Sequence, residues 1–191
     1  ERQRVPLSTL HAIYQTIQEL QEKQDIRLLG GFNPLLFETI IGMPTPFIYE
    51  RLGIKYKNFY VDEFQDTSIL QWKNLIPLLE NATASKESTV LLVGDAKQSI
   101  YRWRGGCPEQ FMRLIKGETP FSISPEVIKL PKNYRSLDTI VTTNNSFFKQ
   151  AAAKLTAPDY QNLFIKGANQ ETNNKPGGTL TFSFVEGQTL D

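Results

Sequence analysis

Apolar residues follow two patterns along the chain, which predict helices interleaved with strands. Apolar residues three or four positions apart mark one face of a helix, whereas short apolar runs mark buried strands. The predicted helices are Ser8–Gln24, Pro34–Ile41, Asp66–Glu80, Pro108–Ile115 and Leu137–Lys154. The predicted strands are Asn58–Val61, Thr89–Val93, Val127–Leu130 and Thr179–Val185. Strands that alternate with helices indicate an α/β fold with a mainly parallel sheet.

The polar residues between these runs predict where the elements begin and where the chain divides. Ser8 is a plausible cap for the first helix, and Asp66 or Thr67 for the helix that follows the first strand. The polar, Asn-rich stretch Ala168–Gly178 is interpreted as a loop. Gly117–Pro125 is the candidate connector between two lobes.

Composition limits the class of protein. The chain has 191 residues, of which 40% are apolar, enough for one core or two small lobes. A net charge of +1 excludes a strongly basic nucleic-acid-binding protein but leaves local basic patches possible. A single cysteine excludes an internal disulfide, and a single histidine argues against a histidine-rich metal site. No apolar run approaches the ~18 residues of a membrane span. We therefore expect a cytoplasmic protein with no membrane partner, and we interpret the chain as a piece of a longer one.

The first candidate for chemistry is the acidic pair Asp62-Glu63, directly after the first predicted strand. Ligands of open α/β sheets bind outside the carboxyl ends of the strands. One carboxylate there could hold Mg²⁺ and the other could orient or deprotonate a water. The alternative is a pair of solvated acids at a strand end.

The second candidate follows the next strand, in the stretch Gly94–Gly106. Gln98 could reach a terminal phosphate or its attacking water. Tyr101, Trp103 and Arg104 interleave aromatic and cationic groups, as single-stranded nucleic acid requires for base stacking and phosphate contact. The alternative is that the two aromatic residues are buried in the core and Arg104 extends from it to solvent.

The third candidate is Leu130–Ser136, between a predicted strand and a helix. Tyr134 could stack on a purine, and Arg135 could stabilise charge on a transferring phosphoryl group. The alternative is an ordinary helix start, with Ser136 as the cap and Arg135 in solvent.

Together these three stretches resemble the UvrD/Rep/PcrA and RecB/AddA group of superfamily 1 DNA helicases. Residues 62–67, Asp-Glu-Phe-Gln-Asp-Thr, resemble motif II, the Walker B element of that family. Residues 94–105 resemble motif III over a dozen positions, and Asn133–Ser136 resembles motif IV.

The resemblance implies an ATP site that uses Mg²⁺. In it, Asp62 would bind the metal and Glu63 would activate water. Gln98 would sense the γ-phosphate and couple it to DNA. Tyr134 would pack on adenine, and Arg135 would contact the γ-phosphate from a second lobe.

The resemblance also implies contacts to single-stranded and duplex DNA, with Tyr101, Trp103 and Arg104 on the single strand. Position 97 is Lys in this chain, whereas an acid is common there in the UvrD-like pattern. This lysine and the stretch Pro44–Gly53 favour the RecB-like, exonuclease-associated branch. That branch adds two expectations, which are a role in DNA repair or recombination and a partner in the form of a second helicase–nuclease subunit.

The implied fold consists of RecA-like parallel sheets with flanking helices, of the P-loop NTPase type, present as partial lobes. Residues 1–54 would be an N-terminal helical segment, 55–118 the second half of the first lobe, and 119–191 the start of the second. The chain contains no Gly-Lys dipeptide, and therefore no phosphate-binding loop of the G-x-x-x-x-G-K-[ST] type. This piece alone is expected to bind ATP poorly and to hydrolyse none.

Two functions from different classes remain open. One is an enzyme, an ATP-dependent DNA helicase of which this chain is the central fragment. The other is a catalytically degenerate, helicase-like scaffold that holds DNA or a partner. Glu63, Gln98 and Arg135 favour the enzyme, because a scaffold has no need of all three.

Overall fold

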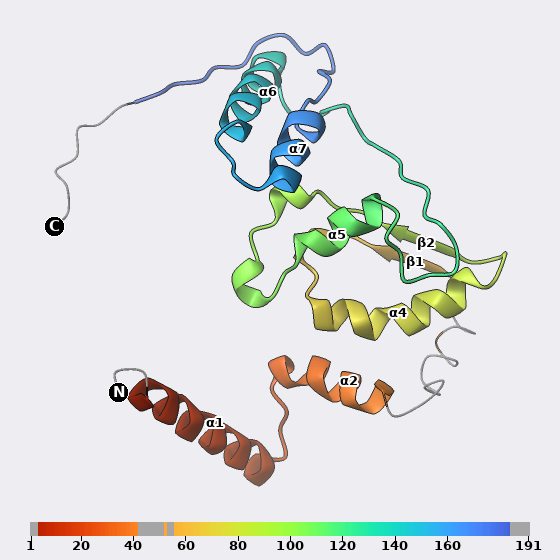
Figure 1. Cartoon of the computed structure of the whole chain (residues 1–191), viewed down its shortest axis with the longest axis vertical. Coiled ribbons are helices and arrows are strands. Elements are labelled where there is room, and N and C mark those ends of the chain that lie inside the picture. Colours follow the sequence, from red (N-terminus) through yellow and green to blue (C-terminus); the bar gives the residue numbers. More distant parts are fainter. Residues whose placement is uncertain (1–3, 42–51, 53–55, 184–191) are drawn as a thin grey trace. The chain divides into compact units, whose positions relative to one another are not determined.

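The computed structural model describes residues 4–41, 52 and 56–183 of the chain. The chain divides into two compact units, drawn in Figure 1. Glu1–Asp95 and Ser99–Ser124 make up unit 1, whereas Ala96–Gln98 and Pro125–Asp191 make up unit 2. The assignment of residues 55–118 and 119–191 to two helicase lobes stays a prediction.

Among the described residues, the sheet of unit 1 consists of two parallel strands, β1 (Asn58–Val61) and β2 (Thr89–Leu92), with Phe59 opposite Val90 and Val61 opposite Leu92. Side chains alternate between the two faces of a strand. One face is half-buried, but the other is exposed and includes Tyr60, with 68% of its surface accessible. The prediction of fully buried strands was therefore wrong for one face.

The core of unit 1 lies on the covered face of this sheet. Helices α4 (Ile69–Thr83) and α5 (Pro108–Ile115) and the short turn η2 (Phe64–Asp66) contribute its buried side chains, which are Phe64, Trp72, Leu79 and Leu114. Phe64 is completely buried. Its ring packs edge to face against the Trp72 ring, with 4.8 Å between the centroids. These contacts hold the carboxyl end of β1 in place, because η2 follows that strand directly.

Helix α4 begins three residues later than the sequence pattern predicted. Its N-cap is Ser68, whose hydroxyl accepts from the backbone N–H of Gln71, while the Gln71 side chain accepts from the Ser68 N–H. The expectation that Asp66 or Thr67 caps the helix was wrong, since this reciprocal capping box satisfies two N–H groups at once.

Replacing Ser68 by Ala is expected to lower the free energy of unfolding by about 0.5–2 kcal/mol, because one helix N–H loses its acceptor. Urea unfolding of the chain measures this change. Ser122→Ala, in an exposed loop, is the matched control and should leave the midpoint nearly unchanged. Equal midpoints for the two variants would contradict the capping role.

An N-terminal helical region precedes the sheet. Helix α1 (Arg4–Gln24) starts before Ser8, so Ser8 lies inside the helix and is not its cap. Its predicted apolar stripe is exposed, including Leu10 and Tyr14. Helix α2 (Phe32–Ile41) packs on α4, where Ile40 meets Leu78 and the Asn74 amide donates to the Asn33 carbonyl at 3.0 Å.

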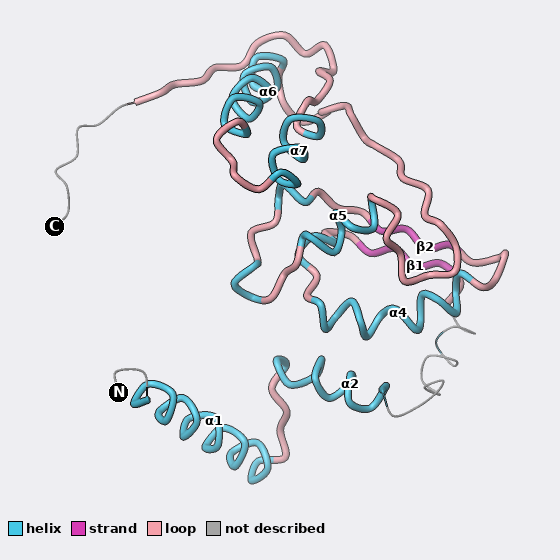
Figure 2. Tube along the Cα trace, viewed as in Figure 1, coloured by secondary structure: helices cyan, strands magenta, loops and turns pink. Residues whose placement is uncertain are grey.

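In unit 2, helix α6 (Asp138–Ala152) packs against helix α7 (Pro158–Gly167), with the Phe148 and Phe164 rings stacked at 5.7 Å. Helix α7 was not predicted. The predicted strand Val127–Leu130 is irregular and exposed instead. Figure 2 draws the chain between α5 and α6 in pink, the colour of loops. Of the predicted strand Thr179–Val185, residues 179–183 are also irregular, and the last two lie outside the described residues.

Candidate nucleotide and DNA site

The two acids predicted for chemistry lie where β1 ends, and both are exposed. Asp62 Oδ1 accepts from the Glu63 N–H at 2.8 Å. Glu63 has a left-handed backbone, with φ 51° and ψ 38°. A non-glycine residue in this region costs on the order of 1–3 kcal/mol, and such strain is concentrated at functional sites. The fold therefore turns the chain sharply at Glu63 and leaves both carboxylates open to solvent.

A third polar side chain, which the sequence analysis did not single out, contacts Glu63 from inside the unit. Gln65 is 1% exposed. Its Nε2 donates to Glu63 Oε2 at 2.6 Å, and its Oε1 accepts from the Asp95 N–H at 2.9 Å. Asp95 follows β2, so one buried amide joins the ends of the two strands. The sequence signal was weak, because a glutamine between Phe64 and Asp66 resembles any polar residue of a turn.

The segments after the two strands are also joined through their backbones. Ser68 and Gly106 form an antiparallel bridge, and the Cys107 N–H donates to the Thr67 carbonyl at 3.1 Å. The buried Gln110 side chain donates to that same carbonyl at 3.0 Å. The aromatic and cationic stretch of motif III is thus anchored to the chain that follows the two acids.

That stretch presents its three predicted DNA-contacting side chains at the surface. Trp103 lies in the turn η4 (Arg102–Arg104) with 79% of its surface exposed, and Tyr101 is 39% exposed. Their rings are 6.3 Å apart, and the Arg104 guanidinium lies 5.6 Å from the Trp103 ring and 5.9 Å from the Tyr101 ring. The alternative that these are buried core aromatics was wrong. We call these three residues the aromatic–arginine cluster.

Gly105 and Glu109 set the geometry of this turn. Gly105 ends η4 with φ 90°, a backbone conformation that glycine adopts without a steric cost. Arg102 pairs with Glu109 on α5 at 2.6 Å. The outward position of Trp103 is therefore built into the local chain.

Gln98 ends the short turn η3 (Ala96–Gln98), and its side chain is exposed. Residues 96–98 group with unit 2, whereas Asp62 and Glu63 belong to unit 1. The structure places Gln98 three residues after the Asp95 that Gln65 contacts. Its role at the γ-phosphate stays a prediction.

The remaining predicted residues, Tyr134 and Arg135, lie in a bend of unit 2 and are exposed. Asn133 shapes this bend, because its Oδ1 accepts from the N–H groups of Arg135 and Ser136 at 3.0 and 2.9 Å. Ser136 is thus not a helix cap, and Leu137 occupies the N-cap position of α6.

The loop after α7 fastens this bend. The Tyr134 carbonyl accepts from the Asn173 amide at 2.9 Å and from the Lys175 ammonium at 3.2 Å. Lys132 lies 5.7 Å from the Tyr134 ring. These bonds hold the Tyr134 backbone, whereas its side chain is exposed, and its role in stacking on adenine stays a prediction.

The donors at the end of β1 fit a magnesium ion better than a transition metal. Among the described residues, no group of three or more His, Cys, Asp or Glu side chains could hold a metal. Mg²⁺ is typically bound through one or two carboxylates, with water and phosphate oxygens completing the shell. The exposed Asp62 carboxylate matches that donor set.

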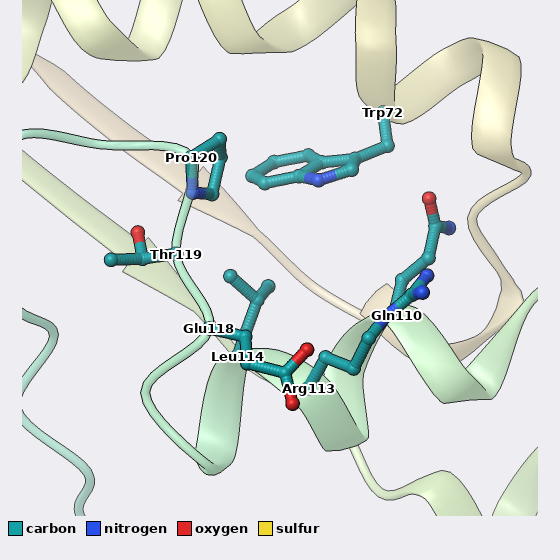
Figure 3. A pocket seen from close by; sticks show the side chains of 7 residues that line it. All are labelled: Trp72, Gln110, Arg113, Leu114, Glu118, Thr119 and Pro120. Atoms are coloured by element: carbon teal, nitrogen blue, oxygen red, sulfur yellow. The ribbon is translucent and has the colours of Figure 1, made fainter.

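A separate hollow of about 350 Å³ opens between α4, α5 and the chain after α5 (Figure 3). Its lining residues are Trp72, Gln110, Arg113, Leu114, Glu118, Thr119 and Pro120. None of them is a predicted site residue. In the part of the chain that the structure describes, no helix is both long and apolar enough to pass through a bilayer.

Comparison with known proteins agrees with the motifs. The family described as UvrD/REP helicase N-terminal domain matches residues 4–118, a range that includes α1. DNA helicase II of Escherichia coli (strain K12) is 32% identical over 164 residues, which cover 85% of this chain and 21% of that protein. ATP-dependent DNA helicase Rep of Buchnera aphidicola subsp. Baizongia pistaciae is 39% identical over 124 residues, covering 62% of this chain and 17% of that protein.

A relative whose name includes a nuclease also matches. One subunit of the ATP-dependent helicase/nuclease of Carboxydothermus hydrogenoformans is 34% identical over 129 residues, covering 66% of this chain and 10% of that protein. The chain thus spans between a tenth and about a fifth of the length of these three relatives. Since the family match covers more than half of its residues, the chain belongs to the UvrD/Rep family of DNA helicases.

Proposed function

We propose that this chain is the central part of a longer, ATP-dependent DNA helicase that hydrolyses ATP to move along single-stranded DNA. One observation carries the proposal: within unit 1, the exposed acids Asp62 and Glu63 and the exposed aromatic–arginine cluster are built on backbone segments that pair with each other. A change at the acids could therefore reach the DNA-contacting residues through a short, hydrogen-bonded path.

In the proposed ATP site, Asp62 holds Mg²⁺, which neutralises charge on the phosphates when it is bound. Glu63 orients and deprotonates the attacking water. Gln98 and Arg135 contact the γ-phosphate, and Tyr134 packs on adenine. The roles of these five residues rest on the resemblance of motifs II, III and IV, and the exposure of the acids supports them.

The fold proposed for the longer protein is RecA-like, with residues 55–118 in the first lobe and 119–191 opening the second. The parallel pair β1–β2, with acids at its carboxyl end, supports this proposal. The phosphate-binding loop would come from another part of the longer protein, because this sequence has no Gly-Lys dipeptide.

The helicase–exonuclease branch, with a role in DNA repair or recombination and a second subunit, is the narrower form of the proposal. The helicase/nuclease relative supports it. It is also supported by Lys97 and by the amino-acid sequence of Pro44–Gly53, a stretch that lies largely outside the described residues.

The test compares the full-length protein with the isolated chain in one ATP hydrolysis assay, with and without single-stranded DNA. The full-length protein should hydrolyse ATP and accelerate with DNA, whereas the 191-residue chain should be inactive. A full-length protein that binds DNA but never hydrolyses ATP would instead be the degenerate scaffold. Hydrolysis by the isolated chain would refute the need for a phosphate-binding loop from elsewhere.

A further inference from the structure

We infer that Gln65 is a positioning residue, which holds the Glu63 carboxylate for catalysis and ties it to the end of β2. This inference rests on the proposed role of Glu63 in ATP hydrolysis. Gln65 itself would touch neither ATP nor water, since its side chain is 1% exposed.

The contacts of the Gln65 amide specify its orientation. Its oxygen receives the Asp95 N–H at 2.9 Å, so its nitrogen must face the Glu63 carboxylate, which it meets at 2.6 Å. A carboxylate accepts hydrogen bonds only, and a backbone N–H donates only. Among uncharged side chains, an amide of this length supplies a donor and an acceptor in the required order.

Gly94 confines the amide from a second side. A Cβ added at Gly94 would lie 2.7 Å from Gln65 Oε1 and 3.3 Å from the Phe64 backbone nitrogen. Next to Gln65, the fully buried Phe64 fixes the backbone in the core. The amide therefore has little room to move, which suits a group that positions another.

Glu63 needs such support because it is exposed and its backbone is left-handed. An exposed glutamate side chain samples many rotamers unless a partner holds it. Reaching the single reactive geometry then costs conformational entropy. A buried, already ordered donor supplies the fixed direction that general-base catalysis requires.

The same amide makes Glu63 sensitive to the second strand. If the backbone at Asp95 shifts, Gln65 must follow or lose a hydrogen bond, and the donor to Glu63 moves with it. Since motif III starts at Gly94–Asp95, its displacement would reach the Glu63 side chain through the Gln65 amide.

The test is Gln65→Met in the full-length protein, which keeps the length of the unbranched side chain and removes both hydrogen bonds. The kcat of DNA-stimulated ATP hydrolysis should fall by at least about tenfold, with the KM for ATP little changed, as for supporting residues of other sites. Asn74→Leu is the matched control, because Asn74 is another buried amide that donates to a backbone carbonyl, that of Asn33, and no part of the proposed site is built on it.

A double variant separates positioning from a structural role. If Gln65 acts through Glu63, adding Gln65→Met to Glu63→Gln should cause almost no further loss in single-turnover hydrolysis. A further loss of about tenfold would overturn the inference. So would equal kcat losses in Gln65→Met and Asn74→Leu.

Gly94→Ala tests the same contact should Gln65→Met fail to fold. The added methyl should displace the Gln65 amide and lower kcat without a matching change in the KM for ATP. An unchanged kcat would overturn the inference. If Glu63→Gln hydrolyses ATP normally, the proposed role of Glu63 itself fails, whereas loss in Glu63→Gln without loss in Gln65→Met refutes only the positioning role.

Discussion

Glu63→Gln in the full-length protein is expected to lower the kcat of DNA-stimulated ATP hydrolysis by about 100- to 10,000-fold, the range for loss of a general base. Glutamine keeps the length of the side chain but cannot take a proton from water. Binding of Mg-ATP, measured by titration with a fluorescent analogue, should remain close to that of the unaltered protein, because Asp62 is intact.

Glu80→Gln is the matched control, since Glu80 is an exposed glutamate of α4 away from the end of β1. It should hydrolyse ATP at the normal rate. Normal turnover in Glu63→Gln would refute the role of this acid, and equal losses in the two variants would point to a general effect of removing a negative charge.

Trp103→Ala is expected to weaken binding of single-stranded DNA by about 5- to 150-fold, the loss that corresponds to one stacked base at about 1–3 kcal/mol. Trp103 is 79% exposed, so no burial must be broken before a base can reach its ring. Fluorescence anisotropy with a labelled oligonucleotide measures the change, and DNA stimulation of hydrolysis should fall with it.

Trp103→Phe is the control for this variant, because phenylalanine retains an aromatic face and should recover most of the affinity. The free energy of unfolding should change by less than about 0.5 kcal/mol in Trp103→Ala, as at other surface positions. Unchanged DNA affinity would remove Trp103 from the proposed DNA path, and a large loss of stability would show that it supports the fold instead.

The elements that were predicted best are those whose signals are local. The β1 strand and α5 have the predicted bounds, because a short apolar run that stops at Asp62 and a helix that starts at Pro108 are both decided by neighbouring residues. The first residue of α4 was wrong, because the capping box depends on a side chain one turn later, Gln71.

Strands were harder to predict, because a strand depends on a partner that is often distant in the sequence. Val127–Leu130 has the composition of a strand but has no strand beside it among the described residues. Helix α7 was overlooked although Pro158 and the spacing of Tyr160, Leu163 and Phe164 suit a helix start and one apolar face.

The same difference between local signals and contacts of distant residues applies to the candidate site. The position of Asp62 and Glu63 at a strand end followed from the order of apolar and acidic residues. The exposure of Trp103 did not, because an aromatic residue beside arginine fits a core or a surface equally well. The contact of Gln65 with residues 63 and 95 joins two strand ends across the sheet, and no local pattern encodes it.

The uncovered face of the β1–β2 pair has a consequence for handling the protein. A parallel sheet is normally covered on both faces, and a two-stranded one is not stable alone. Here Tyr60 and Leu91 are exposed on the open face, and in the described chain neither strand has a second neighbour. A strand without a second neighbour has unpaired backbone N–H and C=O groups along its edge, and in concentrated solution these groups pair with strands of other chains. The isolated 191-residue chain should therefore be purified dilute, and a soluble aggregate in gel filtration would reflect its open sheet rather than a functional oligomer.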